Sequence, residues 1–167
     1  MAALAAGELK IIEVDYQNRE QGAALLYLLD CYASDPMGGG TPLSAAVRDK
    51  LLPALAAMPH AFSLLAYCNH QAVGLVNCFI TLSTFSCQPL VNIHDVVVLP
   101  AWRGKGVSQL LLSQVEVIAR ARGCCKLTLE VLKGNAPARS AYRRFGFSEY
   151  ILDAAMGSAD FWEKPLS

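Results

Sequence analysis

The sequence predicts one mixed α/β domain over residues 1–167, in which helices flank a mixed β-sheet. A chain of 167 residues is long enough for one domain with a single core. Its 54 % apolar and 17 % charged residues are typical of a globular protein. Segments with strand periodicity alternate with segments of helical periodicity, and this order predicts the α/β (α+β) class.

In the N-terminal half, a strand over residues 8–14 is followed by a helix with leucines at helical spacing. Three consecutive glycines then predict a loop, and a second helix is expected to be kinked at Pro53. Two strands follow, joined at a polar turn around Asn69. The elements that follow the first strand are expected at residues 18–33 (helix), 35–42 (loop), 43–57 (helix), and 61–68 and 72–82 (strands).

The C-terminal half is expected to hold a buried strand, an amphipathic helix, another strand, a short helix and two final strands. Gly146 is suited to the left-handed residue that ends the short helix. The strand–helix–strand unit at 91–132 should form a right-handed crossover between parallel strands. The ranges in order are 90–98, 106–122, 125–132, 136–145, 147–152 and 159–165.

Charge and cysteine content limit the classes of function. The formal net charge is zero, so neither nucleic acid nor a membrane surface is predicted as a partner. The six cysteines show no zinc-ligand spacing, so no metal site is predicted, and most are expected to be buried free thiols. The first ten residues lack the basic start of a signal peptide. These features favour a cytoplasmic protein.

The junction between the strand that ends in V-V-V-L-P and the next helix has the chemistry of an anion site. Gly104 and Gly106 allow a tight turn and a close approach of the backbone. The first N–H groups of a helix lack partners and attract anions, and Arg103 and Lys105 add positive charge. The spacings of the Walker loop and the Rossmann fingerprint are both absent. A basic turn with no ligand is the alternative.

Two segments together resemble the GNAT superfamily of N-acetyltransferases. Arg103, Gly106 and Ser108 match that family's acyl-CoA pyrophosphate loop, [RQ]-x-x-G-x-[GA], with serine in place of glycine or alanine. Downstream, N-A-P-A-R-S-A-Y-R-R-F-G-F resembles the family's N-x-x-A-x-x-x-Y-x-x-x-G-F segment, with Asn135, Ala138 and Tyr142 spaced to share a helix face. The resemblance covers residues 60–165.

The resemblance implies a fold and a reaction. The sheet would be mostly antiparallel, with one parallel pair of strands that splay apart. Acetyl-CoA would be the co-substrate and an amine, in a small molecule, a peptide N-terminus or a lysine, would be the acceptor. The pantetheine of acetyl-CoA would bind backbone N–H groups of Val96, Val97 and Val98. The pyrophosphate of acetyl-CoA would bind residues 103–108, Val107 included. Tyr142 would protonate the leaving thiolate.

The general base is left open among three residues. Glu130 has the spacing from Asn135 that is similar to bacterial ribosomal-protein acetyltransferases of this superfamily. His94 lies where polyamine acetyltransferases carry a glutamate, and imidazole exchanges protons near neutral pH. Asp95 adjoins it but is expected to point to the opposite face of the strand. Each of the three is otherwise a structural polar residue.

The acceptor site is expected in the glycine-rich loop, with Asp35, Met37 and Gly38 as candidate contacts and Asp95 as a fourth. Asp30 and Asp35 would attract a cationic amine, although a plain flexible connector is the alternative for this loop. A homodimer is predicted because many members of the superfamily dimerise. A binding module of the same fold, holding acyl-CoA as a sensor without turnover, is the competing function.

Overall fold

The computed structural model describes residues 8–166, which fall into two compact units that meet in sequence at Leu129 and Glu130. The first seven residues, part of the stretch judged not to be a signal peptide, lie outside the described residues. The strands are β1 (Leu9–Glu13), β2 (Ala61–Cys68), β3 (Gln71–Ser83), β4 (Gln88–Val98) and β5 (Leu127–Leu129). The helices are α1 (Arg19–Ser34), α2 (Ala45–Ala56), α3 (Val107–Ala121) and α4 (Ala136–Phe145), with short 3-10 turns at Pro36–Gly38 and Pro100–Trp102.

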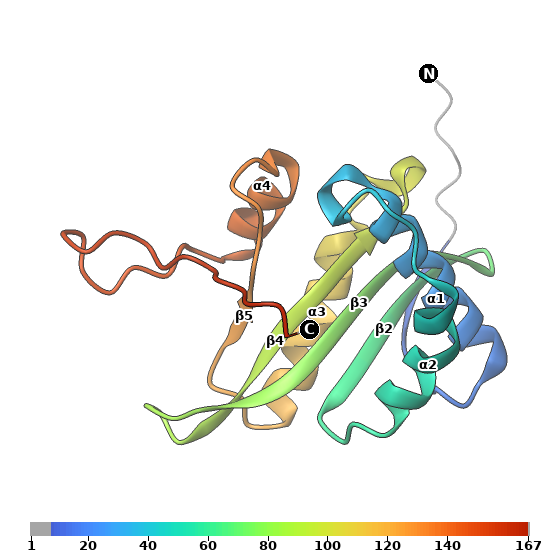
Figure 1. Ribbon diagram of the computed structural model, residues 1–167, viewed down its shortest axis with the longest axis horizontal. Coiled ribbons are helices and arrows are strands. Elements are labelled where there is room, and N and C mark those ends of the chain that lie inside the picture. The colour runs from blue at the N-terminus through green and yellow to red at the C-terminus, as the bar shows by residue number, and fades with distance from the viewer. Residues whose placement is uncertain (1–7, 167) are drawn as a thin grey trace. The chain divides into compact units, whose positions relative to one another are not determined.

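The first unit is built on a five-stranded sheet in the order β1-β2-β3-β4-β5. Neighbouring strands are antiparallel except β4 and β5, which are parallel. This confirms the predicted mixed, mostly antiparallel sheet with one parallel pair. Helices α1 and α2 cover one face of the sheet and α3 covers the other (Figure 1).

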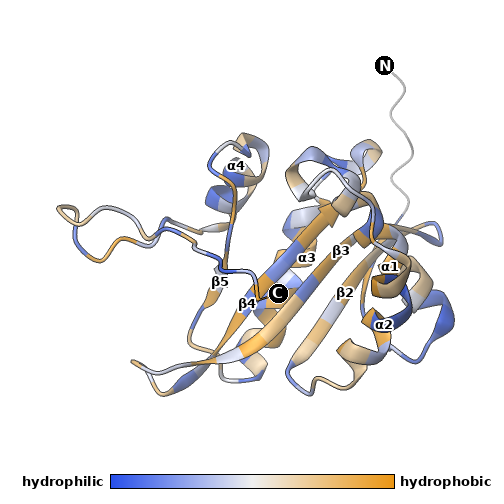
Figure 2. Ribbon diagram, viewed as in Figure 1, coloured by the Kyte–Doolittle hydropathy of each residue, from blue (hydrophilic) through white to orange (hydrophobic). Residues whose placement is uncertain are grey.

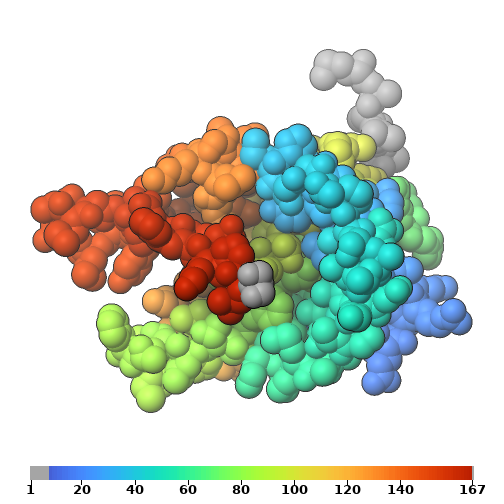
Figure 3. Space-filling model, in the orientation of Figure 1, coloured from blue at the N-terminus to red at the C-terminus, as the bar shows by residue number. Residues whose placement is uncertain are grey.

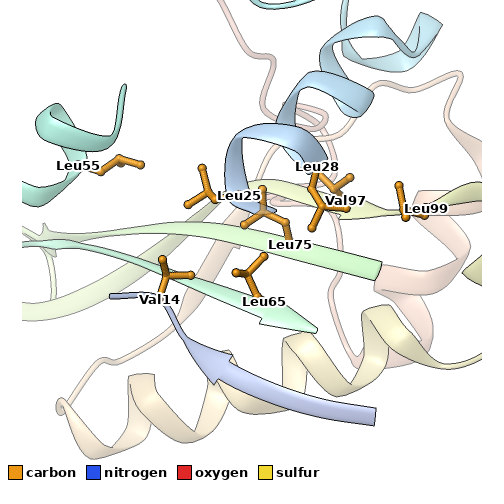
Figure 4. Close-up of a cluster of buried hydrophobic side chains, with 8 residues drawn as sticks. All are labelled: Val14, Leu25, Leu28, Leu55, Leu65, Leu75, Val97 and Leu99. Atoms are coloured by element: carbon orange, nitrogen blue, oxygen red, sulfur yellow. The ribbon is translucent and has the colours of Figure 1, made fainter. Parts of the chain in front are cut away.

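The core between α1 and the sheet explains why these segments fold together. Leu25 and Leu28, one turn apart on α1, point onto Leu75 of β3, and both helix residues are fully buried (Figure 4). Burying a leucine side chain contributes roughly 1.5–3 kcal/mol, so this contact contributes strongly to holding α1 on the sheet. Hydrophobic colours predominate along the strands, whereas α4 in the second unit is largely hydrophilic (Figure 2).

A glycine allows the opposite face of the sheet to receive α3 closely. A Cβ atom added at Gly74 of β3 would lie 2.9 Å from a methyl carbon of Val107 and 3.0 Å from one of Leu111. Both are buried residues of α3. Because only a residue without a side chain fits there, Gly74 places the first turn of α3 directly on the sheet, beside the end of β4.

The second unit begins at Glu130 and is built around α4. Asn135 caps the helix, since its Oδ1 accepts the N–H of Ala138 at 3.2 Å, and Gly146 ends it at φ 111°, as predicted. Arg139 and Arg143 both pair with Glu149 and lower the pKa of that carboxyl.

In the last part of the chain one predicted strand is shorter than expected and two others are wrong. The strand expected over 125–132 is ladder-paired only over Leu127–Leu129. The strands expected near 147–152 and 159–165 are absent from the described residues, which show one isolated bridge between Ile151 and Ser158. Phe161 and Trp162 are 75 % and 86 % exposed, so their apolar pattern has no layer to pack against, and a strand without such packing is not stable.

Candidate active site

The strand β4 loses one of its two neighbours midway along its length. It pairs with β5 only over Val91–Ile93, whereas its pairing with β3 continues to Val98. Within the first unit, residues 94–98 therefore have no strand partner on the β5 side. This is the splayed pair that the resemblance implies, and it leaves that side of Val96, Val97 and Val98 outside any ladder.

A β-bulge lies at the point where this pairing ends. Asn77 of β3 is opposite Asp95, and the next residue, Cys78, is opposite Ile93, so His94 is the extra residue on β4. The bulge shifts the alternation of side chains by one residue. His94 and Asp95 consequently line the same cavity, which corrects the expectation that they point to opposite faces.

That cavity, here called the sheet–helix cavity, has a volume of about 350 Å³ and lies between α1, α2 and strands β3 and β4. Its polar lining consists of Tyr32, Asn77, His94 and Asp95. The ring of His94 is exposed and meets Phe79 edge to face at 5.4 Å between ring centroids. Burial raises the pKa of Tyr32, and the nearby carboxylates of Asp95 and Asp35 raise it further.

A chain of hydrogen bonds runs across three strands to Asp95. The amide nitrogen of Asn77 donates to Asp95 Oδ2 at 2.9 Å, and Ser63 Oγ donates to Asn77 Oδ1 at 2.7 Å. Since the only hydroxyl hydrogen of Ser63 is used, Tyr16 must donate to Ser63 Oγ at 2.9 Å. Every donor therefore points toward the carboxylate, which is held in one orientation.

Sequence reasoning missed this chain. Ser63 is fully buried and Asn77 is 4 % exposed, and each stands alone inside an apolar strand. A buried polar side chain costs about 1–3 kcal/mol without a partner, so a lone serine or asparagine in such a run signals a hydrogen bond. That signal is present in the segments A-F-S-L-L and L-V-N-C-F. The sequence does not reveal which residue the serine or the asparagine bonds, because the partners come from other strands.

The turn before α3 has the predicted glycine geometry. Gly104 and Gly106 adopt φ of 74° and 83°, and a Cβ at either position would meet nothing within 4 Å. Gly106 is the N-cap of α3 and no side chain caps the helix. The side chain of Val107 is buried in the core, so only its backbone faces the turn. Ser108 is half-buried in the first helical turn.

The two cations of this turn are already engaged. Arg103 donates to Asp35 at 3.0 Å and to the carbonyl oxygen of Val98 at 3.2 Å. Lys105 lies over the Trp102 ring, 4.9 Å from its centroid. The Met37 N–H and Arg103 together lower the pKa of Asp35. Asp35 is thus the partner of Arg103 in this structure, and its expected contact with an incoming amine stays a prediction.

The glycine-rich loop is closed on the end of α1. The N–H groups of Gly38 and Gly40 both donate to the carbonyl oxygen of Asp35, at 2.8 and 3.1 Å. A Cβ at Gly38 would lie 2.0 Å from the carbonyl oxygen of Tyr32, so only glycine fits this approach. Gly38 lines the sheet–helix cavity, and Met37 beside it is 41 % exposed.

The remaining predicted residues belong to the second unit. Asn135 and Ala138 form the capped start of α4, and Tyr142 is half-buried with its ring 6.0 Å from that of Phe147. Glu130, the first residue of this unit, is exposed. The site residues are therefore divided between the units, with His94, Asp95 and the turn before α3 in the first.

The described residues were compared with the expectations for metal ligands, membrane-spanning helices and cysteines. Residues 8–166 contain no cluster of three histidine, cysteine or acidic side chains that could hold a metal ion. No helix in the same range is long and apolar enough to cross a bilayer. All six cysteines are free thiols, but only Cys68 and Cys78 are buried, so the expectation that most are buried is wrong.

Comparison with known proteins places the chain among acetyltransferases. It is 41 % identical over 90 residues to the streptothricin acetyltransferase of Streptomyces lavendulae, covering 53 % of this chain and 48 % of that enzyme. It is 31 % identical over 98 residues to an aminoglycoside N(6')-acetyltransferase of Acinetobacter haemolyticus, covering 57 % and 68 %. The chain thus spans about half the length of the first of these relatives and about two thirds of the second.

The fold agrees with this relationship. The solved structure of aminoglycoside N-acetyltransferase AAC(6')-Iy in complex with CoA matches 99 % of this chain and 100 % of that one, with a TM-score of 0.73 at 16 % identity. The model of the Acetyltransferase (GNAT) family matches residues 29–147, which include the splayed strand, the glycine turn and α4. The chain belongs to the Acetyltransferase (GNAT) family.

Proposed function

We propose that this protein is an N-acetyltransferase that moves the acetyl group of acetyl-CoA directly to an amine. The observation that carries the proposal is the sequence of features along β4. The stretch that has no strand partner on the β5 side, residues 94–98, leads through Arg103 into the glycine-capped start of α3. A row of backbone N–H groups suits an amide-containing pantetheine chain, and the helix start suits a pyrophosphate.

The cofactor residues follow from this arrangement. Backbone groups of Val96, Val97 and Val98 would bind pantetheine and polarise the thioester oxygen. Residues 103–108 would bind the pyrophosphate through backbone N–H groups and two cations, with Val107 contributing its N–H alone because its side chain is buried. Asn135, Ala138 and Tyr142 of α4 complete the proposed set by the family's motif.

The ion pair between Arg103 and Asp35 does not block an incoming pyrophosphate. The two side chains are 58 % and 25 % exposed, and an exposed ion pair is worth only about 0–1 kcal/mol. Bonds to charged phosphate oxygens are roughly twice as strong as neutral hydrogen bonds. Asp35 keeps its bond from the Met37 N–H at 2.9 Å when Arg103 turns away, so its loop retains its shape.

In the proposed mechanism, Asp95 binds the acceptor ammonium and His94 removes a proton from it. The freed amine attacks the thioester carbonyl, so that an N–C bond forms and the C–S bond breaks. Tyr142 gives its proton to the departing CoA thiolate, and the second proton that the acetylated nitrogen loses restores the phenol. The shared cavity supports His94 and Asp95 in these roles, whereas Glu130, in the second unit, is the competing base.

We further propose that both units act as one domain, because the family match runs across their boundary. The free thiols favour a reducing compartment such as the cytoplasm. A sensor that binds acyl-CoA without turnover is the alternative function. The histidine and the hydrogen-bonded carboxylate that line one cavity favour turnover over this alternative.

The first prediction tests the cofactor turn. Gly106→Asp should weaken acetyl-CoA binding about 100-fold or more, because a carboxylate would repel the pyrophosphate and displace charge-assisted bonds of about 1.5–3 kcal/mol each. Isothermal calorimetry measures the change. Gly123→Asp is the matched control, since Gly123 has φ of 69°, equally open surroundings, and a place at the opposite end of α3. Equal affinities for the two variants would show that the pyrophosphate binds elsewhere.

The second prediction tests the general acid and separates an enzyme from a sensor. Tyr142→Phe should keep its acetyl-CoA affinity, because the ring still contacts Phe147. Its kcat should fall roughly 10²–10⁴-fold, the usual contribution of a positioned proton donor. Release of free thiol in the presence of an accepted amine measures this. An unchanged kcat would remove Tyr142 from the mechanism.

The third prediction distinguishes the two candidate bases. His94→Gln and Glu130→Gln are compared by kcat/KM between pH 7 and pH 10. Loss of the true base should be severe at pH 7 and should shrink toward pH 10, where an alkylamine of pKa about 10.4 increasingly deprotonates itself. A variant that loses activity equally at all pH values lacks a structural or binding group instead. We expect the pH-dependent recovery in His94→Gln.

The fourth prediction concerns assembly. We expect a homodimer, as in many members of this family, and large apolar side chains remain exposed in the second unit, among them Leu152 and Trp162. Light scattering at micromolar concentrations should give about twice the 18.0 kDa chain mass. A mass of one chain throughout that range would contradict the dimer.

A further inference from the structure

The apolar part of the sheet–helix cavity sets the chemistry of the acceptor. Seven of its twelve lining residues are apolar. Three of these, Val47, Leu51 and Leu55, recur every fourth position along α2, so one face of the helix forms an apolar wall, and Leu43 just before the helix continues it. Leu29 of α1 and Phe79 of β3 extend this wall toward His94. An acceptor that fills the cavity must bury an apolar body.

Two aspartates near the glycine-rich loop, Asp30 and Asp35, do not line the cavity. Asp30 pairs with Arg48 at 2.7 Å and accepts the Leu43 N–H at 2.8 Å. Asp35 pairs with Arg103 at 3.0 Å. Asp95 is the one carboxylate in the cavity lining, and in the chain of hydrogen bonds it accepts from a neutral amide. The cavity lining therefore offers one carboxylate to an acceptor.

Size and charge point to the same class of molecule. A volume of about 350 Å³ lies at the small end of ligand sites, which run from about 300 to 1,000 Å³. A second ammonium on the acceptor would have to be desolvated against the apolar wall of α2, which is strongly unfavourable without a partner. A polycationic acceptor therefore fits this cavity poorly.

We propose that the acceptor is a monoamine, with one ammonium at Asp95 and His94 and an apolar alkyl or aryl body against α2. Residues 30–57, which include α2, form a continuous surface (Figure 3, light blue to teal). The proposal rests on the acetyl transfer proposed above and names its substrate class. It departs from the aminoglycoside and streptothricin acceptors named for the relatives.

The test compares hexylamine with 1,5-diaminopentane, which replaces the terminal methyl group by a second ammonium at equal length. With saturating acetyl-CoA, kcat/KM should be at least tenfold higher for hexylamine. From butylamine to hexylamine it should rise by up to about fourfold per methylene, the value of one buried CH₂. Sisomicin and a tetrapeptide beginning with leucine complete the panel. If the peptide has a higher kcat/KM than hexylamine, the apolar body is the side chain of a peptide residue, and the proposal of a free alkylamine as acceptor is wrong.

Matched variants locate the apolar body. Val47 is 42 % exposed in the first turn of α2, so Val47→Asp is expected to fold, and it should lower kcat/KM for hexylamine at least tenfold through KM. Val117→Asp places the same change on α3, at a residue that is 59 % exposed and does not line the cavity, and it should leave kcat/KM unchanged. Equal effects of the two variants would overturn the placement.

Binding of each amine to the CoA-saturated protein, measured by calorimetry, separates the two proposals. If hexylamine binds more tightly than the diamine but no thiol is released with acetyl-CoA, the acetyl transfer is wrong and the cavity assignment stands. If sisomicin or the diamine is acetylated with the higher kcat/KM, the transfer stands and the monoamine class is wrong. If hexylamine neither binds nor reacts, the monoamine class is also wrong.

Discussion

One extra residue in β4 determines the arrangement of the candidate site. The bulge at His94 shifts the register, so that Ile93 remains opposite Cys78 while Asp95 comes opposite Asn77. At the same point β4 separates from β5. Without the bulge, the pleat would alternate His94 and Asp95 between the two faces of the sheet. The histidine and the carboxylate share a cavity only because of this irregularity, and the open side of the strand begins beside them.

The carboxylate placed by the bulge is supported by the rest of the sheet. Tyr16, Ser63 and Asn77 come from the loop after β1 and from β2 and β3, and each donates one hydrogen bond toward Asp95. Burial raises the pKa of the Tyr16 phenol, which keeps it protonated as the first donor. A polar group buried in an apolar sheet is tolerated only when it has hydrogen-bond partners. Here Ser63 and Asn77 each accept one hydrogen bond and donate the next, and the last of them reaches Asp95.

Local patterns predicted what depends on local physics. Gly106 and Gly146 adopt the positive φ expected at helix ends, and Asn135 caps α4 as its position indicated. The parallel pairing of β4 with β5 followed from the helix between them. The bulge at His94 left no trace in the sequence, since a one-residue slip within H-D-V-V-V changes no periodicity that can be read. The pairing of Arg103 with Asp35, 68 positions away, likewise depends on the fold and could not be read from local sequence.

The same pairings explain how a neutral chain handles charge on both sides of the proposed reaction. Before a pyrophosphate binds, Arg103 and Arg48 each pair with an aspartate near the glycine-rich loop, whereas the one carboxylate in the cavity lining, Asp95, is held by neutral donors. The two pairs differ in permanence. Arg48 is fixed on a carboxylate that also accepts the Leu43 N–H at the entrance to α2, whereas Arg103 sits on the loop where a pyrophosphate would draw it away. The acceptor side therefore keeps its apolar wall and its paired Asp30, whereas on the cofactor side Arg103 would exchange the carboxylate of Asp35 for the pyrophosphate.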